Sequence, residues 1–370
     1  MIYLDNAATT ALSPAAIQAM TKTMTVFGNP SSTHSHGREA SKLLRQARED
    51  IAQALHTQSN KILFTSGGTE SNNTAIKGYA LRHQNRGKHI VTTAIEHHAV
   101  LEVVEYLVDK FGFEATFVQP VDGQIRAADI KKALRPDTIL VSVMAVNNET
   151  GAMLPIKEIG ELLHEHPAVF HVDAVQAIGK LPIYPDELGI DFLSASAHKF
   201  HGPKGVGFLY AKKMDFDNFM HGGDQEEKHR AGTENLISIT GMAAALSESM
   251  EHLEENLDRA QDLKNSLLAD LLGIDYYLNE SQPSLPYVIN LGFPNQKNDL
   301  LLLQMDLNGF SISTGSACTA GAIQPSHVLQ AMYGKDSNRL HESIRISTSD
   351  QTTLQDIQLF TKKLKEILGG

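Results

Sequence analysis

Five short apolar runs in the first 200 residues have the pattern of buried β-strands. Each run is largely continuous rather than alternating with polar residues, which is typical of strands covered on both faces. The runs occupy residues 62–65, 89–93, 138–143, 169–172 and 192–195. Helical patterns separate them, and in the clearest one, residues 36–55, apolar side chains recur on one face. These side chains are Ala40, Leu43, Leu44, Ala47, Ile51 and Ala54. The alternation predicts an open α/β sheet with right-handed crossovers.

The pattern changes near residue 236. Residues 236 to about 272 form a long helical stretch that is charged on one side and rich in alanine, leucine and methionine on the other. Isolated strand patterns follow at residues 287–291, 310–313 and 343–346. The last pattern is an amphipathic helix through Leu354, Ile357, Leu364 and Ile367. These elements predict a second, smaller α+β domain.

Composition and charge narrow the class of protein. A chain of 370 residues is too long for one ordinary core, which agrees with two domains. The formal net charge of −11 makes nucleic acids and anionic membranes poor partners. No apolar run approaches the ~20 residues that span a bilayer, and the first residues lack the pattern of a secretory leader. The single cysteine excludes an internal disulfide, so we expect a cytoplasmic protein.

Three groups of polar residues follow predicted strands, where open α/β folds bind their ligands. Residues 65–70 place two glycines and several hydroxyl groups between a strand and a helix, which suits a phosphate, although many such segments are only turns. Asp173 ends the strand at 169–172 and could equally cap the next helix. Lys199 precedes a glycine-rich turn at 202–205. It is either a solvated loop residue or a desolvated amine that forms an imine with a carbonyl.

Together these groups suit one cofactor, pyridoxal 5'-phosphate. That cofactor needs a phosphate cradle, an imine-forming lysine and an acid that keeps its pyridine nitrogen protonated. Lys199 would form the imine, and Asp173 would face the pyridine nitrogen. The candidates for the phosphate are Gly68, Thr69, Ser196 and His198. Three such motifs at three strand ends are harder to explain by chance than any one alone.

Cys318 is the only cysteine, and small residues surround it from Thr314 to Gly321. A structural thiol is usually buried among large apolar side chains, which this segment does not supply. Two interpretations follow from the residues alone. Cys318 is either an inert, half-buried cysteine or a reactive thiol on a loop.

The motifs as a set resemble the cysteine desulfurases of the class V aminotransferase family, in the subgroup of the nitrogen-fixation and iron–sulfur-cluster enzymes. The resemblance runs nearly end to end. The matching segments are residues 3–10, 29–32, 65–72, 96–100, 147–151, 172–176, 198–199, 202–205, 230–235 and 315–319.

This resemblance implies the fold and the reaction. The fold would be the type I fold of pyridoxal phosphate-dependent transferases. A large, mostly parallel-sheet domain would cover residues 15–245, and residues 1–14 and 246–370 would form the small domain carrying the cysteine loop. The enzyme would convert L-cysteine to L-alanine and keep the sulfur as a persulfide on Cys318. It would then pass the sulfur to an acceptor protein for iron–sulfur cluster assembly or for tRNA or cofactor thiolation.

The resemblance also implies roles for individual residues. Lys199 would form the imine with the cofactor and move protons at the substrate Cα. His97 would stack on the pyridine ring, although the residues alone leave His98 as a competitor and allow a purely structural role. Asn148 and Gln176 would bond the edge of the cofactor, and Asn148 would also face the substrate.

Two further residues complete this expected site. Arg345 would bind the substrate carboxylate with its planar fork, although a strand arginine can also face solvent. Thr233 would complete the phosphate site of the other subunit, so that the active site forms only in a homodimer. His34 and His36 could be read as a metal pair, but no carboxylate or cysteine at suitable spacing supports this, and we expect no metal site.

One departure from the family pattern follows Arg345, where residues 348–351 read Thr-Ser-Asp-Gln. This segment follows the residue that would bind the substrate carboxylate. Selenocysteine lyase is an alternative function, because the same geometry can act on selenium. Another class V enzyme and a catalytically silent binding subunit are further alternatives, although a plain aminotransferase needs no nucleophilic thiol. The presence of Lys199, Asp173, His97 and Cys318 in one chain argues against the silent subunit.

Overall fold

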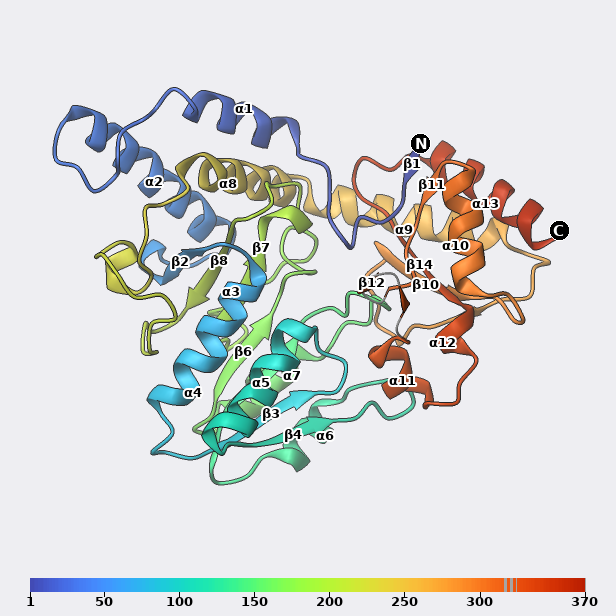
Figure 1. Cartoon of the computed structure of the whole chain (residues 1–370), viewed down its shortest axis with the longest axis horizontal. Coiled ribbons are helices and arrows are strands. Elements are labelled where there is room, and N and C mark those ends of the chain that lie inside the picture. The colour runs from blue at the N-terminus through green and yellow to red at the C-terminus, as the bar shows by residue number, and fades with distance from the viewer. Residues whose placement is uncertain (316–317, 320–321, 324, 370) are drawn as a thin grey trace.

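A seven-stranded sheet forms the centre of the larger part of the chain (Figure 1). The computed structural model describes residues 1–315, 318–319, 322–323 and 325–369. In spatial order the strands are β2 (Ile62–Thr65), β8 (Gly207–Ala211), β7 (Phe192–Ser196), β6 (Val169–Asp173), β5 (Thr138–Met144), β3 (His89–Thr93) and β4 (Glu114–Val118). All neighbouring pairs are parallel except the two that involve β8. The predicted α/β sheet and its five strands are confirmed.

Helices cover both faces of this sheet, which explains the continuous apolar character of its strands. One face packs against α2 (Ser35–Ala54), α6 (Ala127–Ala133), α7 (Ile156–Leu163) and α8 (Leu236–Glu251). The other face packs against α5 (His98–Phe111) and the helical segment made of α3 (Gly68–Asn73), η2 (Thr74–Gly78) and α4 (Tyr79–Arg82). The helix α1 (Pro14–Thr23) lies along α8, outside the first layer. Both faces of the sheet are therefore covered by helices and shielded from solvent, and ligands reach the sheet at its edges.

A third apolar cluster belongs to the C-terminal part of the chain together with the first residues (Figure 1). Its strands are β1 (Ile2–Tyr3) beside β11 (Phe310–Ser311), and the antiparallel set β14 (Ser343–Ser347), β10 (Val288–Gly292) and β9 (Tyr277–Leu278). The helices around it are α9 (Leu253–Asp270), α10 (Asn298–Leu307) and α13 (Leu354–Leu368). The cluster agrees with the expected α+β character, whereas the domain boundaries at residues 14 and 245 stay a prediction.

The helical stretch expected from 236 to 272 is two helices, α8 and α9. They are separated at His252, whose φ of −107° and ψ of 18° leave the helical range. Both helices touch the core of the large sheet, but α9 does so only through Leu257 and Ala260 in its first half, and its second half packs with α13 in the third cluster. Sequence periodicity alone did not reveal this break.

The functional edge of the sheet is the carboxyl end of its parallel strands. The connections that leave this edge after β2, β3, β5, β6 and β7 carry the polar motifs of the sequence. The N-terminal segment, residues 5–10, reaches this edge as well, since Thr10 N bonds His198 O at 2.9 Å and Asn6 N bonds Ser347 O at 3.3 Å. One short stretch of chain therefore links the large sheet to β14.

Candidate active site

The expected phosphate-binding residues line one cleft of about 470 Å³. Its walls are Ala8, Thr9, Ser66, Gly67, Gly68, Thr69, Glu70, Ser196, His198, Lys204 and Gly205. A Cβ atom on Gly68 would lie 2.5 Å from Cγ2 of Val175, so glycine is required for the close approach of α3 to the turn after β6. The structure thus brings together Gly68, Thr69, Ser196 and His198, which lie up to 130 residues apart in the sequence.

His198 is a neutral member of this cleft. Its Nδ1 lies 3.2 Å from the Thr9 hydroxyl. Burial lowers the pKa of His198 to about 4, and the charges of Lys199 and Lys204 act in the same direction. A neutral imidazole can hydrogen-bond a phosphate without adding a charge to it.

Lys199 ends the short helix η3 (Ala197–Lys199), directly after β7. Its ammonium donates to the carbonyl oxygens of Ala7 at 2.6 Å and Ala8 at 2.9 Å. Burial lowers the pKa of Lys199 to about 8, and the charge of Arg345 adds to this, whereas Asp5 and Asp173 oppose it. A substantial fraction of this amine is therefore neutral and nucleophilic near physiological pH.

Asp173 is the last residue of β6 and is only 6% exposed. Its Oδ2 accepts from Asn72 Nδ2 at 2.7 Å, and its Oδ1 accepts from the backbone N of Val175 at 3.0 Å. The second contact is a capping hydrogen bond, which is the alternative role that the sequence allowed for Asp173. The residues that follow form a turn rather than an α-helix. Asn72 was not predicted individually; its only signal is its place in the motif at residues 65–72.

His97 is the N-cap of α5, with Nδ1 accepting from Ala99 N at 3.0 Å. Nδ1 is therefore unprotonated, and the proton of the neutral ring is on Nε2. The pKa of His97 is lowered, mainly because protein atoms displace water around the ring; Asp173 opposes the shift and Lys199 adds to it. The ring of the competing candidate, His98, packs on His327 with centroids 4.7 Å apart.

Thr69 and His97 also line a second cleft of about 440 Å³ between α3 and α5. Lys77 and Tyr106 also line it. The two clefts share Thr69, so the residues around His97 and the expected phosphate-binding residues line adjacent clefts.

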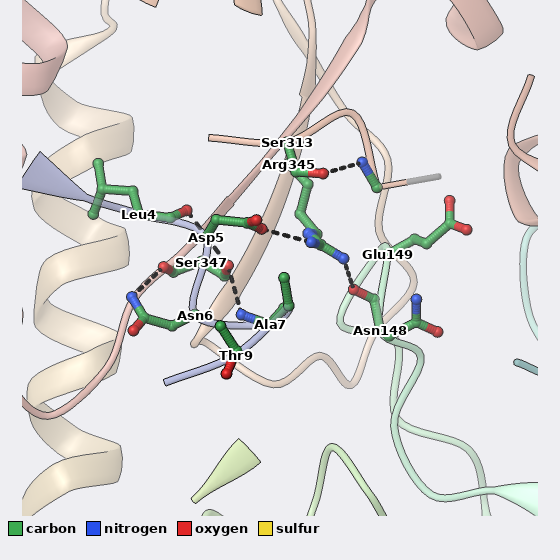
Figure 2. A network of polar contacts seen from close by, with 12 residues as sticks. Leu4, Asp5, Asn6, Ala7, Thr9, Asn148, Glu149, Ser313, Arg345 and Ser347 are labelled. Carbon is green, nitrogen blue, oxygen red and sulfur yellow. Dashed lines mark hydrogen bonds and ion pairs between the residues drawn. The ribbon is translucent and has the colours of Figure 1, made fainter. Parts of the chain in front are cut away.

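Arg345 lies in β14, 4% exposed, so the solvent-facing alternative is wrong (Figure 2). One guanidinium nitrogen contacts Asp5 Oδ1 at 2.6 Å, and another donates to the backbone oxygen of Asn148 at 2.9 Å. Its Nε is buried without a hydrogen-bond partner among the described residues. A buried, unpartnered donor of this kind suits an anionic ligand. Asp5 was not predicted.

Gln176 is joined to Lys199 through the N-terminal segment. Its side-chain amide donates to Ala7 O at 2.9 Å, the same oxygen that accepts from Lys199. Its amide oxygen faces the buried amine of Lys180 at 3.5 Å. The sequence did not point to Lys180, because nothing local distinguishes it from a surface lysine.

Two expected site residues are not part of these contacts. Thr233 is exposed and does not line the phosphate cleft of its own chain. Cys318 is in the two-residue strand β12 (Cys318–Thr319), opposite Ile323 of β13 (Ala322–Ile323). These two paired strands are called the Cys318 hairpin below. The expected loop and the expected role of the thiol fall outside what the structure describes.

His34 and His36, the pair weighed as metal ligands, have other contacts. His34 caps α2 by accepting from Gly37 N at 3.2 Å, and His36 packs on Phe27. Across the described ranges, no three histidine, cysteine or acidic side chains are grouped as metal ligands would be.

Sequence and structure comparisons agree on the family. A sequence model described as Aminotransferase class-V matches residues 2–360, and the chain belongs to this family. The chain is 46% identical over 374 residues to the Bacillus subtilis (strain 168) protein named putative cysteine desulfurase IscS 1, covering 99% of this chain and 98% of that protein.

Solved structures give the same result. A structure titled NifS-like protein superposes with a TM-score of 0.93 at 36% identity, covering 100% of this chain and 99% of that one. Another, titled SspA in complex with cysteine, superposes with a TM-score of 0.84 at 34% identity over 95% of this chain and 100% of the other. These likenesses confirm the fold type that the sequence motifs implied.

Proposed function

We propose that this chain is a pyridoxal phosphate-dependent cysteine desulfurase that converts L-cysteine to L-alanine and carries the sulfur as a persulfide on Cys318. The observation that carries the proposal is the N-terminal segment at the edge of the sheet. It contacts Lys199 through Ala7 and Ala8, and Arg345 through Asp5. A nucleophilic amine and a buried guanidinium thus face one short segment, as an enzyme acting on amino acids requires.

The residues present fit the cofactor. The cleft has room for a phosphate beside Gly68, Thr69, Ser196 and His198, and Asp173 is a buried carboxyl within reach of the same edge. His97 and Gln176 would bound the cofactor on its face and edge. When bound, pyridoxal phosphate supplies an electron sink that acidifies the substrate Cα proton.

The protein's own groups then carry out positioning and proton transfer. Arg345 holds the substrate carboxylate, and the hydrogen bond to the backbone oxygen of Asn148 fixes the direction of its guanidinium group. Lys199, with its lowered pKa, takes the proton from the substrate Cα and returns one to the product. While the Lys199 amine has no covalent bond to the cofactor, the carbonyl oxygens of Ala7 and Ala8 accept hydrogen bonds from it and hold it near the substrate.

Sulfur leaves the substrate by attack of the Cys318 thiolate. A bond forms between the Cys318 sulfur and the substrate sulfur, while the carbon–sulfur bond of the substrate breaks. The electron pair of the broken bond stays with the substrate carbon, which takes a proton, and alanine is released. The sulfur is then on the enzyme as a persulfide, ready for attack by a thiolate of an acceptor protein.

The partners follow from the same scheme. The exposed position of Thr233 supports a homodimer in which it reaches the partner's phosphate cleft. The relatives named IscS support an acceptor in iron–sulfur cluster assembly.

The single cysteine and the net charge of −11 support a cytoplasmic enzyme with no direct binding to nucleic acid. In the part of the chain that is described, no helix is both long and apolar enough to cross a membrane.

Alanine formation tests this proposal. The purified protein, loaded with pyridoxal phosphate and given L-cysteine and a thiol reductant, is expected to release equal amounts of alanine and sulfide. Lys199→Ala is expected to release neither, and L-selenocysteine in a parallel assay shows the preferred substrate. Pyruvate and ammonia in place of alanine, or a preference for selenocysteine of more than about 100-fold (~3 kcal/mol) in kcat/KM, would overturn the proposal.

A further inference from the structure

The side chain of Glu149 hydrogen-bonds one flank of the hairpin that contains Cys318 and lies close to the other. Glu149 is 3% exposed and follows Asn148 in the connection after β5. On one flank, the hydroxyl of Ser326 donates a short hydrogen bond to its Oε2. On the other, a Cβ atom added to Gly315 would lie 3.2 Å from Oε2 and 3.4 Å from the Glu149 Cβ. One buried carboxyl group therefore hydrogen-bonds the chain after the cysteine and lies beside the chain before it.

Both flanks are themselves well defined. Ser326 is buried and caps the helix α11 (His327–Tyr333), accepting from Leu329 N at 3.0 Å while it donates to Glu149. Gly315 has a φ of +89°, which favours glycine, and its amide donates to the Ser313 hydroxyl at 3.1 Å. Ser326 cannot move away from Glu149 without losing its hydrogen bond to that carboxyl, whereas Gly315 is held through Ser313.

Glu149 is fixed from the other side by the turn that it belongs to. Its amide donates to Asn147 Oδ1 at 2.9 Å, and its carbonyl accepts from Asn290 Nδ2 at 3.0 Å. The preceding carbonyl, that of Asn148, accepts from Arg345. Figure 2 shows Glu149 and Asn148 side by side on the turn that faces Arg345. The same turn therefore bonds Arg345 and Ser326 and lies beside Gly315.

The flank after Cys318, at Ser326 and His327, also contacts the segment that carries His97. The ring of His327, the residue after Ser326, contacts the carbonyl oxygen of Glu96 at 2.9 Å. Burial raises the pKa of the Glu149 carboxyl, while the Ser326 hydrogen bond and the charge of Arg345 oppose the rise. A buried carboxyl in this setting makes a strong, directional hydrogen bond.

We propose that Glu149 is a positioning residue for sulfur transfer: it ties Ser326, after the Cys318 hairpin, to the turn that orients Arg345 and packs beside Gly315, before the hairpin, and so sets the distance between the thiol and the bound substrate. This inference rests on the proposed function. It assigns Glu149 no contact with substrate or cofactor, and it separates the positioning of Cys318 from the chemistry at Lys199.

The thiol itself supplies a readout that does not require turnover. Because the chain has one cysteine, the rate of alkylation by iodoacetamide reports on Cys318 alone. We would measure this rate in the cofactor-loaded protein without substrate, and then the rate of persulfide formation by rapid quench with L-cysteine. The visible absorbance of the bound cofactor serves as the measure of an intact Lys199 site.

Glu149→Ala is expected to raise the alkylation rate several-fold and to slow persulfide formation by about 10- to 100-fold, with little change in KM or cofactor absorbance. Glu149→Gln is expected to restore most of the rate, because its amide oxygen still accepts from Ser326. Ser326→Ala should shift both rates in the same direction by a smaller factor. The matched control is Glu342→Ala, which removes a carboxyl that accepts from Tyr277 and from the Asn295 amide but contacts neither flank.

The outcomes separate this inference from the proposed function. Unchanged alkylation and persulfide rates in Glu149→Ala, or changes no larger than in Glu342→Ala, would overturn the positioning role. If Glu149→Ala does not fold, Ser326→Ala and Glu149→Gln decide by the same two rates. A wild-type protein that forms no persulfide would instead refute the proposed function, and the alkylation rates would still show whether Glu149 fixes the hairpin.

Discussion

Asp5 and Arg345, 340 residues apart in the chain, form an ion pair with an O–N distance of 2.6 Å at the centre of the candidate site. The arginine that is expected to bind the substrate carboxylate therefore already faces a carboxylate of its own chain. A second guanidinium nitrogen holds the Asn148 carbonyl, and the buried Nε has no partner in the described part of the structure. If Arg345 binds the substrate carboxylate, as we propose, it binds that group and Asp5 together.

Replacing Asp5 with asparagine tests this competition. Asn at this position still accepts a hydrogen bond from Arg345 but carries no charge, so the guanidinium is left with more positive potential for the substrate. We expect the KM for L-cysteine to fall about threefold to tenfold, with a smaller change in kcat. Steady-state alanine formation measures this. A KM that rises tenfold would mean that Asp5 orients Arg345 instead of competing with the substrate.

Arg345→Lys keeps the positive charge and removes the planar fork. A single ammonium cannot hold Asp5, the Asn148 carbonyl and a substrate carboxylate with the same geometry. We expect kcat/KM to fall by about 100-fold, mostly through KM, while cofactor absorbance is retained. The control is Arg259→Lys, since Arg259 bonds only the Thr352 carbonyl among the described contacts. Equal effects in the two variants would refute carboxylate binding by Arg345.

The lowered pKa of Lys199 predicts how cofactor loading depends on pH. Only the neutral amine attacks an aldehyde, and its fraction rises about tenfold per pH unit below the pKa. The rate of imine formation with added pyridoxal phosphate should therefore rise up to about pH 8 and then level off. Stopped-flow absorbance on the cofactor-free protein measures it, with a free lysine derivative as the control. A rate that keeps rising to pH 10 would contradict the pKa shift.

Lys180 predicts a pH-dependent stability. Burial lowers its pKa from 10.5 to about 7, so the unfolded chain binds this proton more tightly than the folded protein. The destabilisation is full below pH 7 and is lost as the pH rises toward 10.5. Lys180→Met should raise the free energy of unfolding of the cofactor-free protein at pH 7 by about 2–4 kcal/mol, and by less at pH 9. Urea unfolding at both pH values measures this, and a stabilisation independent of pH would contradict it.

The shared active site predicts complementation between two defective variants. If Thr233 completes the partner's phosphate cleft, a dimer of one Lys199→Ala chain and one Thr233→Ala chain has one intact site. At limiting cofactor, a mixture of the two variants allowed to exchange subunits should form more alanine than either alone. The control mixes Lys199→Ala with Asp173→Ala. If both residues serve the cleft of their own chain, each site in the mixed dimer lacks one of them, and no gain in alanine is expected. The absence of a gain in the first mixture would place Thr233 in its own chain's site.

The strands that were predicted and those that were missed differ in a physical way. The five predicted strands lie inside the sheet or at its β2 edge, and all of their residues are buried except the partly buried Val169. β4 is an edge strand with partly exposed residues, which weakens its apolar pattern. β8 is a short buried strand directly after a glycine-rich turn, and its apolar run at residues 208–211 was missed. Helix α9 continued the periodicity of α8, and nothing in that periodicity marked the break at His252.

The residues of the candidate site also fall into two groups, those that the sequence predicted and those that it did not. Lys199, Asp173 and Gly68 could be proposed as site residues because each lies at the end of a strand or within three residues after it, where local sequence shows the chemistry. Asp5, Asn72 and Glu149 could not, because their roles come from contacts with residues about 100 or more positions away. No local pattern encodes a distance between β14 and the first strand.

The most direct test is the intact mass of the protein after brief exposure to L-cysteine and quenching, for wild type and Cys318→Ala. We predict that the wild type gains the mass of one sulfur atom (about 32 Da) with one alanine formed per chain in the first turnover, while Cys318→Ala gains none and keeps its bound cofactor. A sulfur adduct on Cys318→Ala, or alanine formation at the wild-type rate without Cys318, would contradict the role of this thiol and with it the proposed function.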